Sequence, residues 1–456
     1  MADWSTRSFW LQRNDYEPGP HLDGDTSCDV VIVGGGFTGL WSAIALAEAD
    51  PSIDIVVLEQ KVVGYGASGR NGGFAMTMMA RNIHDLTRKV GETQARAMHL
   101  AMRDALHGIL KFAAEEGIDA DITNPGLLTV SNSPAQDRRI QQDVQAAERL
   151  GLDDFEYLTR DKCRELLATE SVRCGHWEDD ALLVDPAALT RGLSEVAKRR
   201  GVRVIEQTPV DDLHEVAGRR VEARTPYGTV RADRAVVATN AYAYAIPWLR
   251  RFIFTIYAYI NLTEPLTEEQ WSRVGWERRM GVEDKRIMLH FFRPTPDGRI
   301  LWGGRDAPFS AEGPNPRRDR DPALFARLEE TFRETFPQLD DVKMDRGWAG
   351  PVCGTINCMP SVGWLGTSRR IAYGLGYAGH GVGPSYLVGR AIRDLMLNWS
   401  TELLELPLFT KKPVPLPPGN SLRAFFLDTS QHILQRADDE GVDTDPLVRA
   451  VLKVLQ

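Results

Sequence analysis

The fold is decided by two neighbouring stretches, Cys28-Asp-Val-Val-Ile-Val-Gly34-Gly-Gly36-Phe-Thr-Gly39 and Ile53-Asp-Ile-Val-Val-Leu-Glu59. The apolar run before Gly34 predicts a buried strand, the glycines a tight turn, and the second apolar run a parallel strand. The residues between the two stretches have the length of a helix. Strand, turn, helix and strand in this order are typical of a unit that binds a dinucleotide.

The spacing Gly34-x-Gly36-x-x-Gly39 has a physical reason at each glycine. The first permits the turn, the second lets the backbone approach a pyrophosphate, and the third lets the helix meet the strand. The phosphates then face backbone N–H groups at the positive end of the helix. Glu59 ends the second strand, where a carboxylate can accept hydrogen bonds from an unphosphorylated adenosine ribose. A glycine turn without a ligand explains the spacing, but it does not explain the terminal acid.

Composition sets the broad class of the protein. The chain has 456 residues, of which 43% are hydrophobic and 26% charged, which is ordinary for a globular protein of two domains. The net charge of −9 gives nucleic acid no general attraction, so we expect no nucleic-acid partner. Residues 1–20 show no export signal, and the most apolar region, residues 234–262, is interrupted by polar residues, so we expect no transmembrane segment. The 5 cysteines do not have the spacing of metal ligands, so we expect no metal site. Their odd number suits a reducing compartment, so we expect a cytoplasmic location.

The rest of the chain predicts two kinds of sheet. A long helix is expected over residues 83–116, a strand over 126–131, a helix after Asp185-Pro186 and strands over 202–205 and 234–239. Residues 252–262, 287–293 and 299–304 are rich in β-formers and predict an antiparallel sheet. A helix is expected around residues 325–336, and residues 371–375 predict a last parallel strand followed by a helix to about residue 398. The chain thus returns to the nucleotide-binding sheet near its end.

Two further glycine-rich loops suit a flat ligand. Residues 64–73 contain five glycines in ten residues, and such a loop can lie with its backbone against a ring system. Residues 376–383 enter a helix at Pro384, and the N-terminus of that helix can face the edge of a flavin where negative charge gathers on reduction. The alternative for this second loop is a tight strand-to-helix turn.

Four motifs together resemble the FAD-dependent oxidoreductases of the D-amino-acid-oxidase superfamily, in particular the gamma-glutamylputrescine-oxidase-like members. The motifs are Val33-Gly-Gly-Gly-Phe-Thr-Gly-Leu-Trp41, Gly66-Ala-Ser-Gly-Arg-Asn-Gly-Gly73, Ala238-Thr-Asn-Ala-Tyr242 and Gly376-Tyr-Ala-Gly-His-Gly381. The resemblance covers about residues 27–400. It implies α/β plus α+β architecture: a Rossmann-like, glutathione-reductase-type FAD-binding domain with a second, antiparallel-sheet substrate domain, both built from discontinuous segments. We expect residues 27–81, 160–245 and 345–400 in the first domain, 82–159 and 246–344 in the second, and 401–456 as a linker and amphipathic tail.

The resemblance also implies which residues approach FAD. Ser68 and Arg70 correspond to loop residues near the flavin or its phosphates, Val210 to a strand end that holds adenine, and His380 to a flavin neighbour. For Arg70 the alternative is an exposed arginine paired with a surface acid. For His380 it is a histidine that only makes structural hydrogen bonds. The expected cofactor-binding set is Gly34, Gly36, Phe37, Thr38, Gly39, Glu59, Gln60, Gly66, Ala67, Ser68, Arg70, Asn71, Gly72, Gly73, Val210, Thr239, Gly376, Gly379, His380, Gly381, Val382 and Gly383.

Two departures from relatives are informative. Sarcosine-oxidase-like enzymes carry a carboxylate-binding lysine where this chain has Gly383, which puts a simple α-amino acid substrate in doubt. Some relatives attach flavin through a cysteine where this chain has Gly350, and Cys353 and Cys358 fall out of register. We therefore expect noncovalent FAD.

The implied reaction is oxidation of the C–N bond of a primary or secondary amine by hydride transfer to flavin N5, giving an aldehyde and ammonia or an amine. Oxygen or another acceptor then reoxidises the flavin. The expected catalytic residues are His380, Tyr257, Tyr259 and Trp348, the last three as an aromatic wall for an ammonium group. Core packing, which explains the aromatic residues without any ligand, is the favoured alternative for these three. Arg293 and Arg305 could bind a remote carboxylate or phosphonate, or could be solvated.

Two other functions stay open at this point. One is a D-amino-acid or N-methyl-amino-acid dehydrogenase or oxidase. The other is a flavin-retaining binding protein that acts through its C-terminal tail, whose apolar residues Leu422, Phe425, Phe426 and Ile433 could instead pack on the body of the protein. The oligomeric state is not predicted.

Overall fold

The predicted strand–turn–helix–strand unit forms the centre of the first sheet in the computed structural model. The structure describes residues 3–13, 15–79, 81–216, 220–407, 413–441 and 445–455. β1 (Thr26–Val33) is parallel to β2 (Ile55–Leu58), and α2 (Phe37–Ala49) connects them. β1 is buried because its residues alternate between two cores: Val30 and Ile32 face the helices, and Val31 faces the opposite layer.

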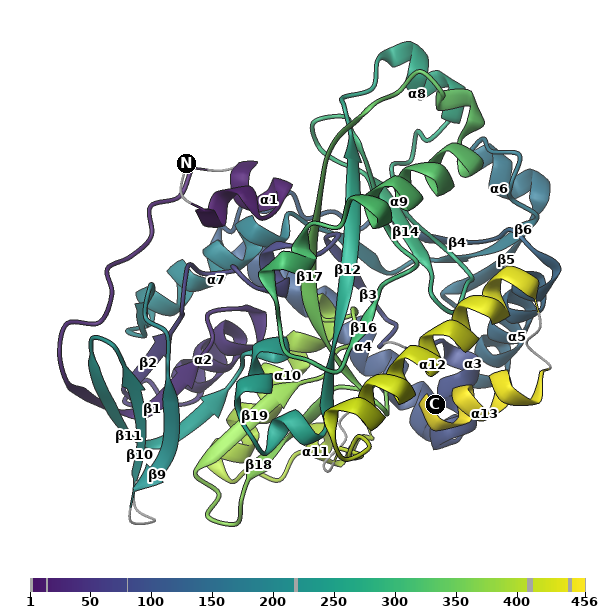
Figure 1. The fold of residues 1–456 in the computed structure, drawn as a ribbon. Coiled ribbons are helices and arrows are strands. Elements are labelled where there is room, and N and C mark those ends of the chain that lie inside the picture. The colour runs from purple at the N-terminus through teal and green to yellow at the C-terminus, as the bar shows by residue number, and fades with distance from the viewer. Residues whose placement is uncertain are drawn as a thin grey trace.

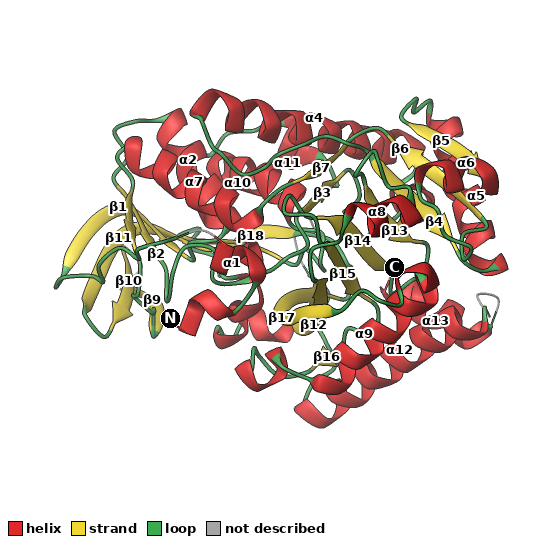
Figure 2. Ribbon diagram, turned by 90° about the horizontal axis from the view of Figure 1, so that it is seen from above, coloured by secondary structure: helices red, strands yellow, loops and turns green. Residues whose placement is uncertain are grey.

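The first sheet brings together strands from distant parts of the chain. β1 pairs in parallel with β11, and β11 pairs in parallel with β19, which confirms the expected late return to this sheet. Figure 2 shows the helices α2, α7 and α10 together over one face of this sheet. The spatial order is β18 (Ser361–Leu365), β19 (Ile371–Leu375), β11 (Gly228–Val237), β1, β2 and β8 (Arg203–Ile205), with β10 (Arg220–Thr225) and β9 (Asp212–Val216) added antiparallel at β11.

A second, mostly antiparallel sheet lies beside the first (Figure 1). Its order is β16 (Phe309–Ser310), β12 (Ile253–Thr263), β15 (Ile300–Gly304), β14 (His290–Pro294), β13 (Gly281–Asp284), β4 (Leu127–Ser131), β6 (Cys174–Glu178) and β5 (Phe155–Thr159), and β17 (Met344–Thr355) also pairs with β12. The pairing of β13 with β4 is parallel. A third, two-stranded sheet joins β3 (Phe74–Met76) to β7 (Ala181–Leu183).

The predicted combination of a Rossmann-like sheet and a second sheet is confirmed. Two strands that fall within the segments expected for the FAD-binding domain belong to the second sheet instead. The expected segments 160–245 and 345–400 of the FAD-binding part contain β6 and nearly all of β17, but these strands hydrogen-bond to β4 and β12 of the second sheet. The division of the chain into domains stays a prediction.

Helices cover both sheets. The helices are α1 (Phe9–Arg13), α3 (Ile83–Val90), α4 (Glu92–Glu116), α5 (Pro134–Leu150), α6 (Arg160–Leu166), α7 (Pro186–Arg199), α8 (Glu268–Val274), α9 (Pro322–Thr335), α10 (Val382–Leu397), α11 (Glu402–Glu405), α12 (Asn420–Glu440) and α13 (Pro446–Leu455). The single helix expected over residues 83–116 is two helices, because Gly91 between them has φ of +83° and breaks the helical path. In the described part of the chain no helix has the length and apolar character needed to cross a bilayer.

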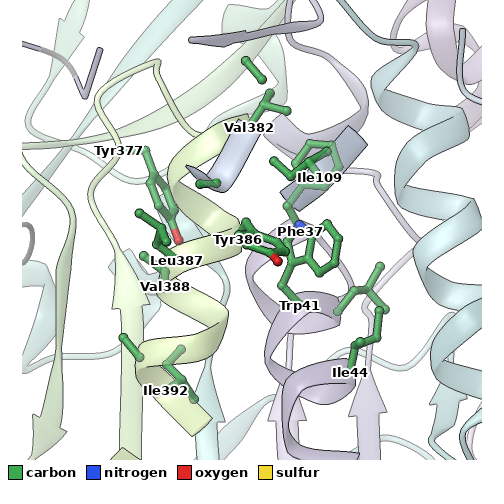
Figure 3. Packing of buried hydrophobic residues seen from close by; sticks show 14 of the residues in the cluster. Phe37, Trp41, Ile44, Ile109, Tyr377, Val382, Tyr386, Leu387, Val388 and Ile392 are labelled. Carbon is green, nitrogen blue, oxygen red and sulfur yellow. The ribbon is translucent and has the colours of Figure 1, made fainter. Parts of the chain in front are cut away.

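Helices α2 and α10 pack directly against each other, although more than 300 residues separate them in the sequence (Figure 3). Trp41 of α2 lies edge-on to Tyr386 of α10, with ring centroids 4.9 Å apart. A Cβ at Gly389 would lie 2.6 Å from the Cβ of Trp41, so only glycine lets the two helices approach this closely. This contact fixes the two helix N-termini relative to each other.

Candidate active site

The first glycine turn leaves no room for side chains. Gly34 has φ of +113°, and a Cβ there would lie 2.7 Å from the carbonyl oxygen of Ala238, at the end of β11. A Cβ at Gly39 would lie 2.0 Å from the carbonyl oxygen of Gly34, and a Cβ at Gly36 2.8 Å from Oγ of Ser68. The turn is therefore closed against its own strand and against the loop that holds Ser68.

The N-terminus of α2 lacks a capping side chain from its own N-cap residue. Its N-cap residue Gly36 has no side chain to cap the first turn. The amide of Phe37 donates to Oγ of Ser68 at 3.0 Å. Amides in a first helical turn lack intrahelical acceptors and favour an anion such as a phosphate.

Glu59 lies buried beside this turn. Its Oε2 accepts from the amide of Gly35 at 2.9 Å, and its Oε1 accepts from the amide of Lys61 at 3.0 Å. Burial raises the pKa of Glu59 to about 7, although these amides favour the charged form. Each carboxylate oxygen has a further lone pair, so the group can still accept from two neighbouring hydroxyls. The neighbouring Gln60 is half-buried.

The loop of residues 66–73 is shaped by its own side chains and by the N-terminal segment. Asn71 donates to the carbonyl oxygens of Ala67 and Ser68, at 2.9 and 3.0 Å, and accepts from the amide of Gly73. Trp10 donates to the carbonyl oxygen of Asn71 at 2.9 Å. Asn71 thus holds the shape of the loop. A Cβ at Gly72 would lie 2.6 Å from the ring of Phe291, which places the loop against the second sheet.

Arg70 is a buried cation with one unused donor group. Its Nε donates to the carbonyl oxygen of Tyr65 at 2.8 Å, and its Nη1 lies 3.0 Å from Oδ2 of Asp319. Its Nη2 is buried and has no hydrogen-bond partner in the described structure. Its side chain lies against Gly350, where an added Cβ would be 3.1 Å from Cδ. Arg70 therefore presents a charged donor at the junction of the two sheets.

The late loop of residues 376–383 lies beside the first turn. The hydroxyl groups of Tyr377 and Thr38 are 2.6 Å apart, which joins the late loop to the first turn of α2. Gly376 and Gly379 have φ of +90° and +101°. The N-cap of α10 is Gly381, again without a capping side chain. Val382 and Gly383 are buried at the start of α10, and a Cβ at Gly383 would lie 3.3 Å from the carbonyl oxygen of Met76.

His380 is half-buried within this late loop. Burial lowers its pKa to about 4, so the imidazole is neutral near pH 7. Its Nδ1 is buried without a hydrogen-bond partner in the described structure. A neutral imidazole can donate or accept one hydrogen bond at each nitrogen, according to its tautomer.

The other expected cofactor residues lie around the carboxyl ends of the parallel strands. Thr239 follows β11, and its amide would lie 3.3 Å from a Cβ at Gly34. Val210 follows β8 and packs against the core beneath the first sheet. Thus the ends of β1, β2, β8, β11 and β19 meet at one edge, which is where doubly wound sheets bind ligands.

The three aromatic residues expected to line a substrate wall do not share one face. Tyr257 and Tyr259 point from β12 into the core under α9, and their hydroxyls donate to the carbonyl oxygens of Asn315 and Arg318. Trp348 pairs with Ile260 in the register of β12 and β17, so it lies on the opposite face. Its indole N–H donates to the carbonyl oxygen of Arg70 at 2.8 Å. Trp348 is therefore the one of the three that contacts the loop of residues 66–73.

The two arginines considered for a remote anion already have partners. Arg293 is buried and donates to the carbonyl oxygens of Gly73 and Val184, at 3.0 and 2.9 Å. Burial lowers its pKa to about 9. Arg305 pairs with Asp306 and with Asp439 of α12. Both guanidinium groups thus hold parts of the fold together.

Sequence reasoning missed several groups. Asp319 pairs with Arg70 but carries no local signal, because the two residues are 249 positions apart in the sequence. Glu206 accepts from the hydroxyl of Tyr16 and from the amide of Val63, at 2.7 and 2.5 Å, and ties the N-terminal segment to the end of β8. A third group consists of the buried His176, Glu178 and Glu283 on β6 and β13. The sequence did contain a signal for this group, because ionisable residues alternate with apolar ones along these two strands.

These features fit a long dinucleotide. Two helices present N-termini without a capping side chain, joined through Thr38 and Tyr377. Glycines of their turns leave no room for a Cβ, as at Gly39, or have positive φ, as at Gly376. The buried Glu59 lies beside the first turn, and Nη2 of Arg70, which has no hydrogen-bond partner in the described structure, lies where the loop of residues 66–73 meets the second sheet.

The family model for FAD dependent oxidoreductases (DAO) matches residues 29–395. The chain belongs to this family. The resemblance seen in the four sequence motifs is thereby confirmed, and the protein is an FAD-dependent oxidoreductase.

The relatives extend over nearly the whole chain. Gamma-glutamylputrescine oxidoreductase of Escherichia coli (strain K12) is 32% identical over 429 residues, covering 93% of this chain and 96% of that protein. Glycine oxidase of Bacillus subtilis is 24% identical, over 81% of this chain and 93% of that protein. Among solved structures, L-proline dehydrogenase from P. horikoshii has a TM-score of 0.69 at 20% identity and covers 85% of this chain and 96% of that chain. This last likeness shows the shared fold.

Proposed function

We propose that the protein oxidises the C–N bond of a primary or secondary amine. The observation that carries the proposal is the joined pair of uncapped helix N-termini at the edge of the first sheet, with Arg70 and Trp348 where the loop of residues 66–73 meets the second sheet. It is supported by the 32% identity to a gamma-glutamylputrescine oxidoreductase over 93% of the chain.

The chain's own residues would hold FAD at both ends. The first turn of α2, with Ser68, would bind the pyrophosphate, Glu59 the adenosine ribose, and Val210 the adenine. The N-terminus of α10, the N–H groups around Gly381 and Nη2 of Arg70 would lie against the flavin. When bound, FAD supplies the acceptor for the hydride that leaves the substrate carbon.

The protein's part in the reaction is to position the amine and keep it neutral. The buried Trp348 and the partly buried Phe291 would form an apolar rim that keeps water from the reacting carbon. His380, neutral because burial lowers its pKa to about 4, can accept a hydrogen bond from the amine without repelling it by charge. We propose His380 and Trp348 as the residues next to the reacting carbon, and Tyr257 and Tyr259 as the packing that supports β12 from its other face.

We propose that FAD is held without a covalent bond. Gly350 stands against Arg70 and offers no sulfur. The nearby Cys353 is fully buried in the core under the first sheet, and burial raises the pKa of its thiol to about 12, so it is not a nucleophile near pH 7. Acid precipitation should release the yellow colour into the supernatant, and colour that stays with the precipitated protein would contradict noncovalent binding.

The experiment that tests the function is a panel of substrates given to FAD-loaded protein. Alkyl amines, secondary amines, D-amino acids and N-methyl amino acids are supplied in turn, with either oxygen or a soluble quinone as acceptor, and the carbonyl product and ammonia are measured. Turnover of amines with little turnover of amino acids is expected. Turnover of amino acids alone would favour the second candidate, an amino-acid or N-methyl-amino-acid oxidoreductase.

The C-terminal tail is attached to the body of the protein. Asp438 of α12 accepts from the amides of Ile287 and Met288, both at 2.9 Å, and pairs with Arg139. Leu427 is fully buried against β16 and its neighbours. These contacts favour a structural role for α12 over a binding protein that acts through a free tail. Removal of residues 415–456 should then lower stability rather than abolish a separate binding activity.

A further inference from the structure

A small cavity lies between the segment after β3 and three strands of the second sheet. Thr77, Met78 and Met79 line it on one side. Thr129 of β4, His176 and Glu178 of β6, and Glu283 of β13 line it on the other. Its free volume is about 30 Å³, which is roughly the space of one water molecule or one ammonium group.

The cavity adjoins the proposed flavin site. Glu283 and Phe291 pair across β13 and β14, and Phe291 pairs with Gly303 and lies against Gly72, so these residues share the sheet face that meets the loop of residues 66–73. Thr77 directly follows Met76, whose carbonyl oxygen lies next to Gly383 at the start of α10. The same short segment therefore borders both the cavity and the start of α10.

The cavity contains buried polar atoms that lack partners. His176 is 3% exposed, and neither of its ring nitrogens has a hydrogen-bond partner within the described structure. Glu283 is also 3% exposed, and its Oε2 is unpartnered there. Glu178 accepts one hydrogen bond, from Oγ1 of Thr77 at 2.9 Å. Buried polar atoms of this kind are costly unless something else completes their hydrogen bonds.

The two glutamates lie near the cation Lys285 but form no ion pair with it. In the part of the chain that the structure describes, neither Glu178 nor Glu283 forms an ion pair. Lys285, which lines the same cavity, is paired with Asp143. Arg81 donates to the carbonyl oxygen of Asn357 at 2.5 Å. Burial raises the pKa of Glu178 to about 8 and that of Glu283 to about 7, and the nearby charge of Lys285, which is paired with Asp143, offsets this effect only in part.

The chemistry of the cavity selects one kind of ligand. Within the described residues no group of three or more His, Cys, Asp or Glu could hold a metal ion. Burial lowers the pKa of His176 well below its ordinary value, so it is a neutral hydrogen-bonding group. Two carboxyl groups and a neutral imidazole match the three N–H donors of a primary ammonium group. The neighbouring Met78, Met79, Leu86 and Leu127 give the approach to these groups an apolar lining suited to methylene groups.

We propose that this cavity binds the remote, non-reacting ammonium group of a substrate that carries its two nitrogens on a methylene chain, with Glu178 and Glu283 as the ionic partners and His176 as a neutral acceptor. The inference rests on the proposed amine oxidation, because the other nitrogen then lies at the flavin. It also replaces the remote anion considered from the sequence, since Arg293 and Arg305 already have partners.

Three probes of equal length test the proposal. FAD-loaded protein whose flavin has first been reduced with dithionite, so that no turnover can occur, is titrated without oxygen, by calorimetry, with 1,5-diaminopentane, pentylamine and 5-aminopentanoate. The diamine should bind about tenfold or more tightly than pentylamine, since hydrogen bonds between charged groups are worth roughly a factor of ten or more. Equal affinity for diamine and monoamine would overturn the proposal. Tighter binding of 5-aminopentanoate would also overturn it, because Arg81 and Lys285 would then be recognising a carboxylate.

Isosteric variants of the two glutamates test whether the preference for the diamine arises in this cavity. In Glu178→Gln and Glu283→Gln the ratio of the diamine and monoamine dissociation constants should fall toward one. The matched control is Glu156→Gln on β5, whose side chain is 59% exposed and pairs with Lys162, and it should keep the wild-type ratio. A ratio that is unchanged in both cavity variants would overturn the assignment, and the flavin content of each variant shows whether it has folded.

Proton release gives a readout that does not need turnover. Glu178 is surrounded by Thr77, Asp154, Glu283 and Lys285, and Glu283 by Thr129, Asp143, Asp284 and Lys285. A bound cation favours the ionised carboxylates, and the amine kept neutral at the flavin loses its own proton whether the ligand is the diamine or pentylamine. Binding at pH 7 should therefore release roughly one proton more per diamine than per pentylamine. This is measured in two buffers of different ionisation enthalpy. Equal release by the two ligands, or less release by the diamine, would contradict the proposal. Diamine binding without any flavin reduction would instead preserve the ammonium site and contradict the proposed oxidation.

Discussion

Replacement of Gly39 by alanine tests the closed turn that the whole site depends on. The added methyl carbon would lie 2.0 Å from the carbonyl oxygen of Gly34, whereas ordinary contact begins at 3.4 Å, so α2 has to move by about 1.4 Å. The obstacle is backbone, which cannot rotate away. Overpacking of this kind costs about 1–3 kcal/mol, while alanine in a helix gains up to about 1 kcal/mol over glycine. We expect net destabilisation of the apoprotein by about 1–2 kcal/mol and weaker FAD binding, because the first turn of α2 moves away from Ser68 and Tyr377.

Urea unfolding of the apoprotein and titration with FAD measure the two effects. For the urea measurement alone, since Gly66 lies in the loop proposed to hold FAD, the matched control is Gly66→Ala, whose methyl group would meet nothing closer than a ring carbon of Tyr242 at 3.7 Å. Its apoprotein should stay within about 0.5 kcal/mol of the wild type. For Gly39→Ala, helix propensity alone predicts a higher free energy of unfolding, whereas the clash predicts a lower one. A Gly39→Ala protein as stable as the wild type, or more stable, would refute the reasoning.

Three further substitutions probe charge and packing elsewhere. Asp319→Asn leaves the buried Arg70 without its carboxylate and should lower the free energy of unfolding by about 3 kcal/mol in urea titration; a loss below about 1 kcal/mol would show that Asp319 does not stabilise Arg70. Glu178, with a pKa raised by burial to about 8, favours the folded state while protonated, and its stabilisation is lost as pH rises from the ordinary glutamate range through about 8. Glu178→Gln should therefore remove part of this dependence and stabilise the apoprotein at high pH by about one to a few kcal/mol, and unfolding curves that keep the wild-type pH slope would contradict the assignment. Leu427→Ala removes a fully buried side chain of α12 and should cost about 2–4 kcal/mol, whereas Phe425→Ala, at 68% exposure, should cost less than about 0.5 kcal/mol; similar losses in both thermal melts would mean that α12 does not dock as described.

The cofactor side of the molecule could be predicted from sequence because its signals are local. The glycines near Gly34, the acid at Glu59 and the abrupt end of the strand before Thr239 each report a constraint set by a few neighbouring residues. The late loop at Gly376 has the same character. Even the contact between distant motifs follows, because carboxyl ends of parallel strands meet at one edge. What the local pattern could not give is the hydrogen bond between Thr38 and Tyr377, which depends on how α2 and α10 pack.

The substrate side could not be predicted as well, because its residues come together only through the register of the second sheet. Tyr257, Tyr259 and Trp348 look equivalent in sequence, yet the pairing of Ile260 with Trp348 sends Trp348 to the opposite face. Arg293 and Arg305 look available, but their partners are backbone carbonyls and a tail acid far along the chain. The break between α3 and α4 was also missed, since an apolar stripe continues across Gly91 and only its φ of +83° interrupts the helix.

The central claim, that this chain uses FAD to oxidise an amine, is tested most directly by a single-turnover titration. FAD-loaded protein is mixed without oxygen with increasing 1,5-diaminopentane, and flavin absorbance and released ammonia are followed together. The account predicts that the flavin bleaches to an end point of one amine per FAD, with an equal amount of ammonia. A flavin that dithionite reduces but that neither this diamine nor any monoamine bleaches would contradict it.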